Sequence, residues 1–130
     1  MSRLLNDLDP VFRPFAVEFL ARCVEAQIPV LIVDTLRTPA EQADNIARGV
    51  SWTKNSLHLV GRAIDVCPYE LYTLAAGGDK LQWDTTDPVW LKLGRIGEAC
   101  GMEWGGRWLR TPDMGHFQYK APAAPRGPTA

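Results

Sequence analysis

The amino-acid sequence predicts an α+β fold, in which helices pack against a small, mainly antiparallel sheet. Two observations lead to this class. Segments with helical apolar spacing alternate with short apolar segments in the order helix, strand, helix, strand, helix, strand. The later strands are short and are separated by loops, which favours helices segregated against an antiparallel sheet. A small doubly wound parallel sheet is the alternative that this order leaves open.

The first helix is expected over residues 10–27. Asp9 resembles an N-cap, and Pro10 would occupy the first turn, where its missing N–H costs nothing. Pro29 stops the helix. The apolar run at residues 30–33 is rich in β-branched side chains and predicts a buried strand. The helix prediction rests on apolar residues that recur mostly at helical spacing: Val11, Phe15, Val17, Phe19, Leu20, Cys23 and Val24.

A second helix is expected over residues 39–48. Thr38 and Glu41 form a capping box around a proline at the first helical position, and Gly49 is placed to end the helix in the left-handed conformation. Arg37 lies between the strand and this helix, where a substrate-facing role is at least as plausible as a surface position. Residues 50–55 are expected to form a loop.

The central stretch, residues 56–65, contains a glycine between two apolar segments. Gly61 predicts a turn or short hairpin, followed by a buried strand over residues 62–67 that Pro68 ends. Asp65 then lies on a core strand, where an ionised carboxylate is costly unless it is paired or bound to metal. Residues 69–87 are expected to be loop.

The last part of the chain predicts one more helix and one more strand. Asp87 and Pro88 begin the helix, and Gly101 ends it. Residues 102–108 form an aromatic and glycine-rich turn, and residues 115–119 a short strand that carries His116. Residues 1–120 are predicted to be a single catalytic domain, and the Ala/Pro-rich residues 121–130 a disordered tail. The helix carries an apolar stripe formed by Val89, Trp90, Leu93, Ile96 and Cys100.

Composition excludes several classes of partner. A length of 130 residues suffices for one core without disulfides, and the three cysteines are expected to be free thiols in a reducing compartment. The net charge of −1 and the absence of a basic run indicate no nucleic-acid or membrane-surface partner. No signal-peptide core or membrane span is apparent, so the chain is expected to be cytoplasmic and monomeric.

A zinc site is predicted from the two histidines of the sequence, His58 and His116. Each lies in a short polar cluster within apolar sequence, and Asp65 follows His58 across the expected turn at Gly61. Neighbouring strands would present these side chains to one ion. Two imidazoles and a carboxylate, with a fourth position open to water, are the ligand set of catalytic zinc. We therefore predict one Zn²⁺ ion per chain, bound by His58, Asp65 and His116.

Asp113 lies three residues before His116 and is a candidate general base for a metal-activated water. Each of these residues, taken separately, could have an ordinary structural role. A single histidine is more often a hydrogen-bonded core or surface residue, and Asp113 follows Pro112 and suits a turn. The conjunction of these residues in one short chain favours metal-assisted hydrolysis.

These motifs also resemble those of a known enzyme family. The patterns Ser56-x-His58-x-x-Gly61-x-Ala63-x-Asp65, Trp104-Gly105-Gly106-x-Trp108 and Asp113-x-x-His116-Phe117-Gln118 are similar to those of the zinc D-alanyl-D-alanine carboxypeptidase and L-alanyl-D-glutamate endopeptidase family (VanY-like), and most closely to its phage endolysin branch. Arg37-Thr38-Pro39-x-x-Gln42 resembles an early arginine motif of that branch. The resemblance spans about residues 31–119.

The resemblance implies a Hedgehog/DD-peptidase-like zinc peptidase fold and hydrolysis of peptidoglycan stem peptides. It implies His58, Asp65 and His116 as zinc ligands, and Asp113 and Arg37 as catalytic residues. Residues on the substrate side would be Ser56, Gln42 and Trp104. Met114-Gly115 stands where the family often has proline, which we expect to alter loop stiffness only.

The resemblance leaves three functions open. The first is an endolysin-type L-alanyl-D-glutamate endopeptidase, which would reach the cell wall only through a membrane pore. The second is a D-alanyl-D-alanine carboxypeptidase or dipeptidase. The third is a non-catalytic, zinc-stabilised wall-binding domain, which would have no reason to keep Asp113 and Arg37 together.

Overall fold

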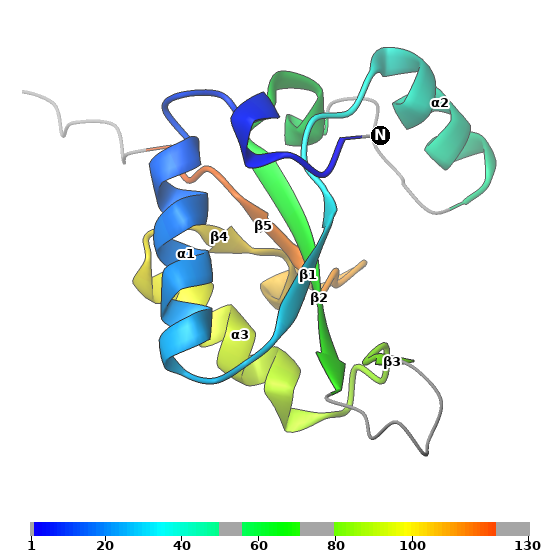
Figure 1. Ribbon diagram of the computed structural model, residues 1–130. Coiled ribbons are helices and arrows are strands. Elements are labelled where there is room, and N and C mark those ends of the chain that lie inside the picture. The colour runs from blue at the N-terminus through cyan, green and yellow to red at the C-terminus, as the bar shows by residue number, and fades with distance from the viewer. Residues whose placement is uncertain (1, 50–55, 71–79, 122–130) are drawn as a thin grey trace, which may run out of the picture.

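The computed structural model describes residues 2–49, 56–70 and 80–121 of the chain. Its sheet has the strand order β1-β2-β5-β4, and every neighbouring pair is antiparallel (Figure 1). A fifth strand, β3, pairs antiparallel with the far end of β2. This topology confirms the α+β prediction and excludes the parallel alternative. The strands are β1 (Val30–Asp34), β2 (Ala63–Glu70), β3 (Lys80–Leu81), β4 (Glu103–Trp104) and β5 (His116–Gln118).

Two helices, α1 (Arg13–Glu25) and α3 (Pro88–Ala99), lie side by side against one face of the sheet, whereas α2 (Pro39–Ala47) stands apart beyond the end of β1 (Figure 1). Helix α1 begins later than predicted, because Asp9 caps a turn that precedes the helix. Its carboxylate accepts a hydrogen bond from the Val11 N–H, and its carbonyl accepts from the Arg13 N–H. The helix proper has Phe12 as its N-cap.

The predicted caps of α2 and α3 are confirmed. The Thr38 hydroxyl accepts from the Glu41 N–H, and the Glu41 carboxylate accepts from the Thr38 N–H. The Asp87 carboxylate caps α3 through the Val89 N–H. Gly49, after α2, has a φ of 74°, the left-handed conformation in which a glycine carries no Cβ penalty.

Strand β2 continues to Glu70 although Pro68 was predicted to end it. Along β2 the Tyr69 N–H points toward the side of β1 and donates to the carbonyl of Pro29, the residue before that strand, while residues 66 and 68 present their backbone polar groups to the opposite side. On that side the Pro68 carbonyl accepts from the Gln82 N–H, and no donor is required of the proline nitrogen. The region predicted as loop, residues 69–87, thus also contains the end of β2 and the short strand β3.

The predicted turn at Gly61 is the end of a 3₁₀ helix, η2 (Leu57–Val60), so His58 lies on a helical turn and not on a strand. Gly61 has a φ of 69°, and a Cβ there would lie 2.8 Å from the Asp9 backbone nitrogen. The Asp9 N–H donates to the Gly61 carbonyl over 2.9 Å. Glycine is therefore required where η2 meets the segment before α1.

The core lies between the two helices and the sheet. Phe117 of β5 contacts Phe19 of α1, with ring centroids 4.5 Å apart. Gly94 and Gly97 of α3 let the helix approach the sheet, because a Cβ at these positions would lie 2.4 Å from Trp104 and 2.3 Å from Phe117. Along β5 successive side chains point to opposite faces, so His116 and Gln118 lie on the face away from this core.

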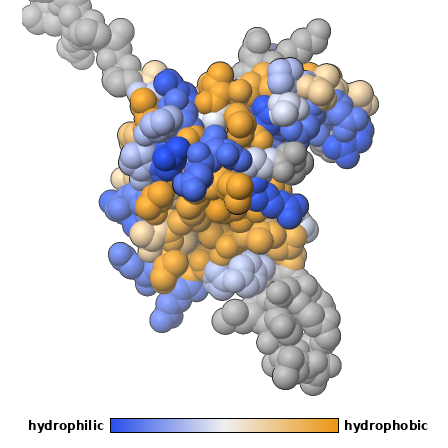
Figure 2. All heavy atoms as spheres, turned by 45° about the horizontal axis from the view of Figure 1, so that its top comes forward, coloured by the Kyte–Doolittle hydropathy of each residue, from blue (hydrophilic) through white to orange (hydrophobic). Residues whose placement is uncertain are grey.

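Some large hydrophobic side chains remain at the surface, and Figure 2 shows hydrophobic residues gathered across the middle of one face, beside hydrophilic ones. The most exposed large hydrophobic residues are Leu4, Val24, Val60, Trp83 and Leu109.

In the part of the chain that the structure describes, no helix is long and apolar enough to cross a membrane. The predicted loop at 50–55 and the predicted tail beyond residue 121 lie outside the described residues.

Candidate metal centre

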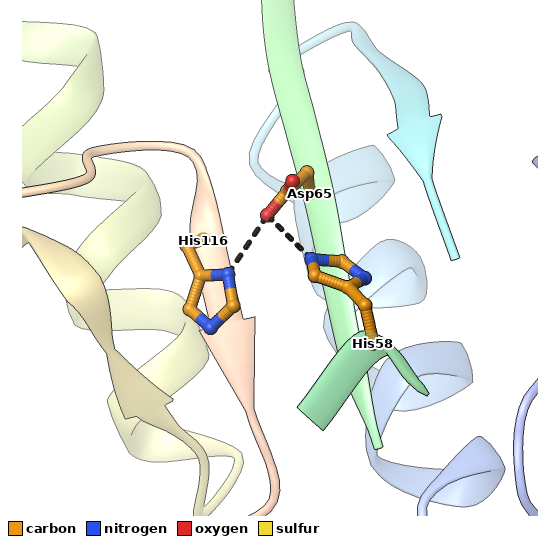
Figure 3. Close-up of side chains that lie close together, drawn as sticks. All are labelled: His58, Asp65 and His116. Carbon is orange, nitrogen blue, oxygen red and sulfur yellow. Dashed lines mark hydrogen bonds and ion pairs between the residues drawn. The ribbon is translucent and has the colours of Figure 1, made fainter. Parts of the chain in front are cut away.

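The structure brings His58, Asp65 and His116 together from three elements: η2, β2 and β5 (Figure 3). Oδ1 of Asp65 lies 3.1 Å from Nε2 of His58 and 2.9 Å from Nδ1 of His116. One ligand atom from each residue lies within 4.8 Å of the other two. Ligands bound to one zinc ion at 2.0–2.2 Å are separated by roughly 3.3–3.5 Å, so the two contacts of Asp65 would lengthen by only a few tenths of an ångström around an ion.

Backbone pairing explains this convergence. Asp65 and His116 are direct partners across the antiparallel pair β2–β5, which places their side chains next to each other on one face. His58 is brought in by η2: its N–H donates to the Ser56 hydroxyl, and its carbonyl accepts from the Arg37 N–H at the exit of β1. Ser56 therefore supports the position of His58, and its predicted place on the substrate side stays a prediction.

The hydrogen bonds of the two histidines suit a metal. Nδ1 of His58 lies 2.6 Å from the Thr35 carbonyl oxygen, which can only accept, so this nitrogen carries the proton. Nε2 then presents its lone pair toward Asp65; it is buried and makes no hydrogen bond with a described residue. A buried nitrogen without a donor, aimed at a carboxylate, is costly unless a cation lies between them. The residues present thus fit zinc.

The charges of the site reinforce one another. Burial alone would raise the pKa of Asp65, but its hydrogen bond with His116 and the neighbouring His58 hold that pKa well below the ordinary value. Burial alone would lower the pKa of His116, but the hydrogen bond and charge of Asp65 raise it. Asp65 is therefore ionised at neutral pH, the form that binds metal.

Asp113 lies at the rim of the site. Its N–H donates to the Gly105 carbonyl, and its own carbonyl accepts from the His116 N–H, which fixes the turn that leads into β5. The residue is exposed, yet desolvation of its carboxylate and the negative charge of Asp65 raise its pKa. A carboxylate with a raised pKa, close to the metal ligands, has the character of a general base.

Arg37 is held in a buried polar cluster at the same end of the sheet. Its guanidinium donates through both Nε and Nη2 to Oδ2 of Asp34, and through Nη1 to the Gln42 side chain over 2.5 Å. Nη2 also lies 3.5 Å from Oδ2 of Asp65. This contact is made with the carboxylate oxygen of Asp65 that does not face the histidines. Because the Arg37 side chain is only 9% exposed, it offers little surface to a substrate.

Two predicted substrate residues are buried. Gln42 is 2% exposed and accepts from Arg37, so it supports the arginine. Trp104 is 3% exposed, packs against Gly94 and Gly106, and donates its indole N–H to the Met114 carbonyl. Its strand turns the Trp104 side chain toward α3, and the predicted contact between Trp104 and a substrate stays a prediction.

Sequence reasoning missed the residues around the ligands. Gln118 accepts from Nε2 of His116 over 2.8 Å, and its amide donates to Glu103 over 2.7 Å. The position of Gln118, two residues after His116 on a predicted strand, could have indicated a shared face. Asp34 and the Thr35 carbonyl carried no such signal, because their roles depend on the pairing of β1 with β2.

Comparison with known proteins agrees with this geometry. A family model described as D-alanyl-D-alanine carboxypeptidase matches residues 49–119, which include the three candidate ligands and Asp113. The L-alanyl-D-glutamate peptidase of Listeria phage A118 is 36% identical over 93 residues, which are 71% of this chain and 31% of that protein. The L-alanyl-D-glutamate peptidase of Escherichia phage T5 is 35% identical over 77 residues, 57% of this chain and 50% of that protein. The chain thus spans half or less of the length of these two phage relatives.

Two bacterial proteins are similar over more of their length. Peptidoglycan L-alanyl-D-glutamate endopeptidase CwlK of Bacillus subtilis is 26% identical over 129 residues, covering 87% of this chain and 74% of that protein. The crystal structure of the L-Ala D-Glu endopeptidase ChiX of Serratia marcescens superposes with a TM-score of 0.63 at 28% identity, over 89% of this chain and 83% of that chain. With the family model matched over more than half of its residues, the chain belongs to the D-alanyl-D-alanine carboxypeptidase family of peptidases.

Proposed function

We propose that the chain is a zinc-dependent peptidoglycan peptidase of the endolysin type, an L-alanyl-D-glutamate endopeptidase that hydrolyses stem peptides. The observation that carries the proposal is the convergence of His58, Asp65 and His116, with Asp113 at the rim. The names of the phage and bacterial relatives support the choice of bond. In a phage setting such an enzyme would act on the wall after release through a membrane pore.

The three ligands would hold one zinc ion through Nε2 of His58, Nδ1 of His116 and Oδ1 of Asp65. A zinc ion held in this way supplies a Lewis acid that polarises the peptide carbonyl and makes water a stronger acid. The Thr35 carbonyl and the Gln118 side chain keep the two imidazole rings in place.

Asp113 would take the proton of the attacking water on its carboxylate and pass it to the nitrogen of the leaving amine. The raised pKa of Asp113, caused by desolvation and by Asp65, favours the first transfer, because a carboxylate that binds its proton more tightly is the stronger base. Arg37 would keep Asp65 ionised and oriented through its contact of 3.5 Å, while Asp34 fixes the guanidinium.

A D-alanyl-D-alanine carboxypeptidase is the second candidate, because the matching family model carries that description. The two reactions leave different ends. Cleavage between L-alanine and D-glutamate creates a new amino group on D-glutamate, whereas the carboxypeptidase releases free D-alanine.

The test is digestion of purified peptidoglycan by the zinc-loaded protein, with mass spectrometry of the new ends. We expect new N-terminal D-glutamate and no free D-alanine. Asp113→Asn is the matched variant: it should bind zinc like the wild type and lose about 10²–10⁴-fold in rate. Free D-alanine alone would favour the second candidate, and zinc binding without any new end would favour a wall-binding domain.

A further inference from the structure

A continuous row of polar side chains crosses the face of the sheet that carries the metal site. The row begins at the ligand His116, passes to Gln118 on the same strand, and reaches Glu103 on the neighbouring strand β4. Glu103 and Gln118 are direct partners in the β4–β5 register, just as Asp65 and His116 are in the β2–β5 register. Trp108 ends the row, donating its indole N–H to Oε2 of Glu103 over 3.2 Å.

The row has a fixed direction. An ionised carboxylate has no proton to give, so the group of Gln118 that faces Oε2 of Glu103 must be its NH₂, at 2.7 Å. The amide oxygen of Gln118 must then face His116. Since this oxygen can only accept, Nε2 of His116 must carry a proton, and the 2.8 Å separation is that of a hydrogen bond.

This direction matters for the metal. A histidine binds metal through the nitrogen that carries no proton, and its other nitrogen usually donates to a second group that orients the ring. With the proton held on Nε2, the nitrogen of His116 that can bind metal is Nδ1, which is the one that faces Asp65 at 2.9 Å. The opposite orientation of the amide would favour a proton on Nδ1 and leave the lone pair pointing away from the site.

We propose that Glu103, acting through Gln118, is a positioning residue that fixes the tautomer and the ring orientation of His116 for zinc. The inference rests on the proposed function in that it takes His116 as a zinc ligand. Trp108 supports it on two sides, since it donates to Glu103 and its ring lies 5.0 Å from the imidazole of His116. Glu103 does not touch the reacting atoms and acts only through this row.

The donor and acceptor groups of the row can be exchanged by substitution at residues 103 and 118. In Gln118→Glu, two carboxylates face each other where an amide met a carboxylate, so the bond to Glu103 is lost and repulsion turns the side chain. In the double variant Glu103→Gln with Gln118→Glu, the amide at 103 donates to the carboxylate at 118, which accepts from Nε2 of His116. The exchange restores the two bonds between residue 103 and His116 with the groups in exchanged places. The Trp108 N–H, which shares Oε2 of Glu103 with Gln118, would have to turn to the oxygen of the new amide.

The test measures zinc affinity by competition with a chelator for the wild type, the single variants and the exchanged pair. Substitutions next to metal ligands typically cost 10–100-fold in affinity, and we expect a loss of that size for Gln118→Glu and recovery to within a few-fold in the exchanged pair. Nitrogen-15 spectra of the zinc-loaded wild type and exchanged pair should show the proton of His116 on Nε2. Arg107→Gln, which removes the exposed pair with Glu98 and the contact of the guanidinium with the Trp104 ring but no bond of the row, is the control and should bind zinc like the wild type.

The outcomes separate the two proposals. If the wild type bound no zinc, the proposed function would fail. If the wild type bound zinc and Gln118→Glu bound it equally well, or if the exchanged pair stayed as weak as Gln118→Glu while remaining folded, the positioning role would be wrong. A zinc-loaded wild type with the His116 proton on Nδ1 would also overturn it.

Discussion

Gly97 of α3 and Phe117 of β5 are in such close contact that a Cβ at residue 97 would lie 2.3 Å from the phenylalanine ring. Phe117 is fully buried and directly follows His116 in the strand. The glycine therefore sets how closely the helix packs on the strand that carries a candidate metal ligand.

Replacing Gly97 by alanine should destabilise the protein. Overpacking a core costs about 1–3 kcal/mol, while alanine recovers only about 1 kcal/mol in helix propensity. Urea unfolding would measure the difference. Gly49→Ala is the control: its Cβ meets nothing within 4 Å, so only the left-handed backbone, at about 1–2 kcal/mol, opposes it. A Gly97→Ala protein as stable as the wild type would show that the Phe117 ring can move aside.

Arg37→Lys should weaken zinc binding and lower kcat with little change in KM. Lysine keeps a positive charge but cannot donate to Asp34 and Asp65 from one rigid fork. Because the arginine side chain is only 9% exposed, its effect on substrate should pass through Asp65. Steady-state kinetics at saturating zinc measure the changes in kcat and KM, and competition with a chelator measures the change in zinc affinity. A change confined to KM would mean that the guanidinium docks the substrate directly.

The metal-free protein should be most stable between about pH 4 and 6.5. The raised pKa of His116, which Asp65 sustains against burial, adds stability that is present below the ordinary histidine value of 6.5 and is lost as the pH rises through the folded pKa. The lowered pKa of Asp65 adds stability that is present above 3.8 and is lost as the pH falls. Urea unfolding of chelator-treated protein over a range of pH would measure the loss of stability at both the acidic and the basic end. In His116→Gln the loss above pH 6.5 should disappear, and an identical loss in that variant would assign it to another group.

Cys23 should resist thiol reagents in the folded protein. Burial, with a smaller contribution from Cys100, raises its pKa to about 12. At pH 8 the reactive thiolate is then about one molecule in ten thousand. Cys23→Ala should leave the reaction of the native protein unchanged and remove one of the three thiols counted after unfolding in denaturant. Rapid labelling of Cys23 in native protein would contradict the burial of this thiol.

Local features of the fold could be predicted from sequence because they depend on neighbouring residues. The caps at Thr38 and Asp87 are examples, since each side chain bonds a backbone group two or three positions away. The continuation of β2 past Pro68 could not be predicted, because it depends on which side of the strand needs a donor. The same holds for His58, whose helical turn is fixed by contacts with Arg37 and with the segment before α1.

The candidate site divides in the same way. The residues that zinc chemistry requires could be chosen by type, because the chain offers two histidines and places Asp65 on an apolar strand. The residues that orient them lie on other strands. Asp34 faces Asp65 only because of a register shift in β1, and Glu103 meets Gln118 only through β4–β5 pairing.

Strand β5 places a metal-site residue, His116, and a core residue, Phe117, at adjacent positions. The number of residues in the turn that leads into β5 is therefore constrained. A slip of one residue against β2 would turn His116 toward the helices and Phe117 toward solvent. Gly115 opposes such a slip, because it passes so close to β2 that a Cβ would lie 2.3 Å from the Val66 carbonyl oxygen. Insertion or deletion of a single residue between Asp113 and His116 would therefore force such a slip, and would place His116 on the core face and Phe117 on the face of the metal site. The exposed turn at residues 84–86 has no such coupling, and a change of length there should leave both intact.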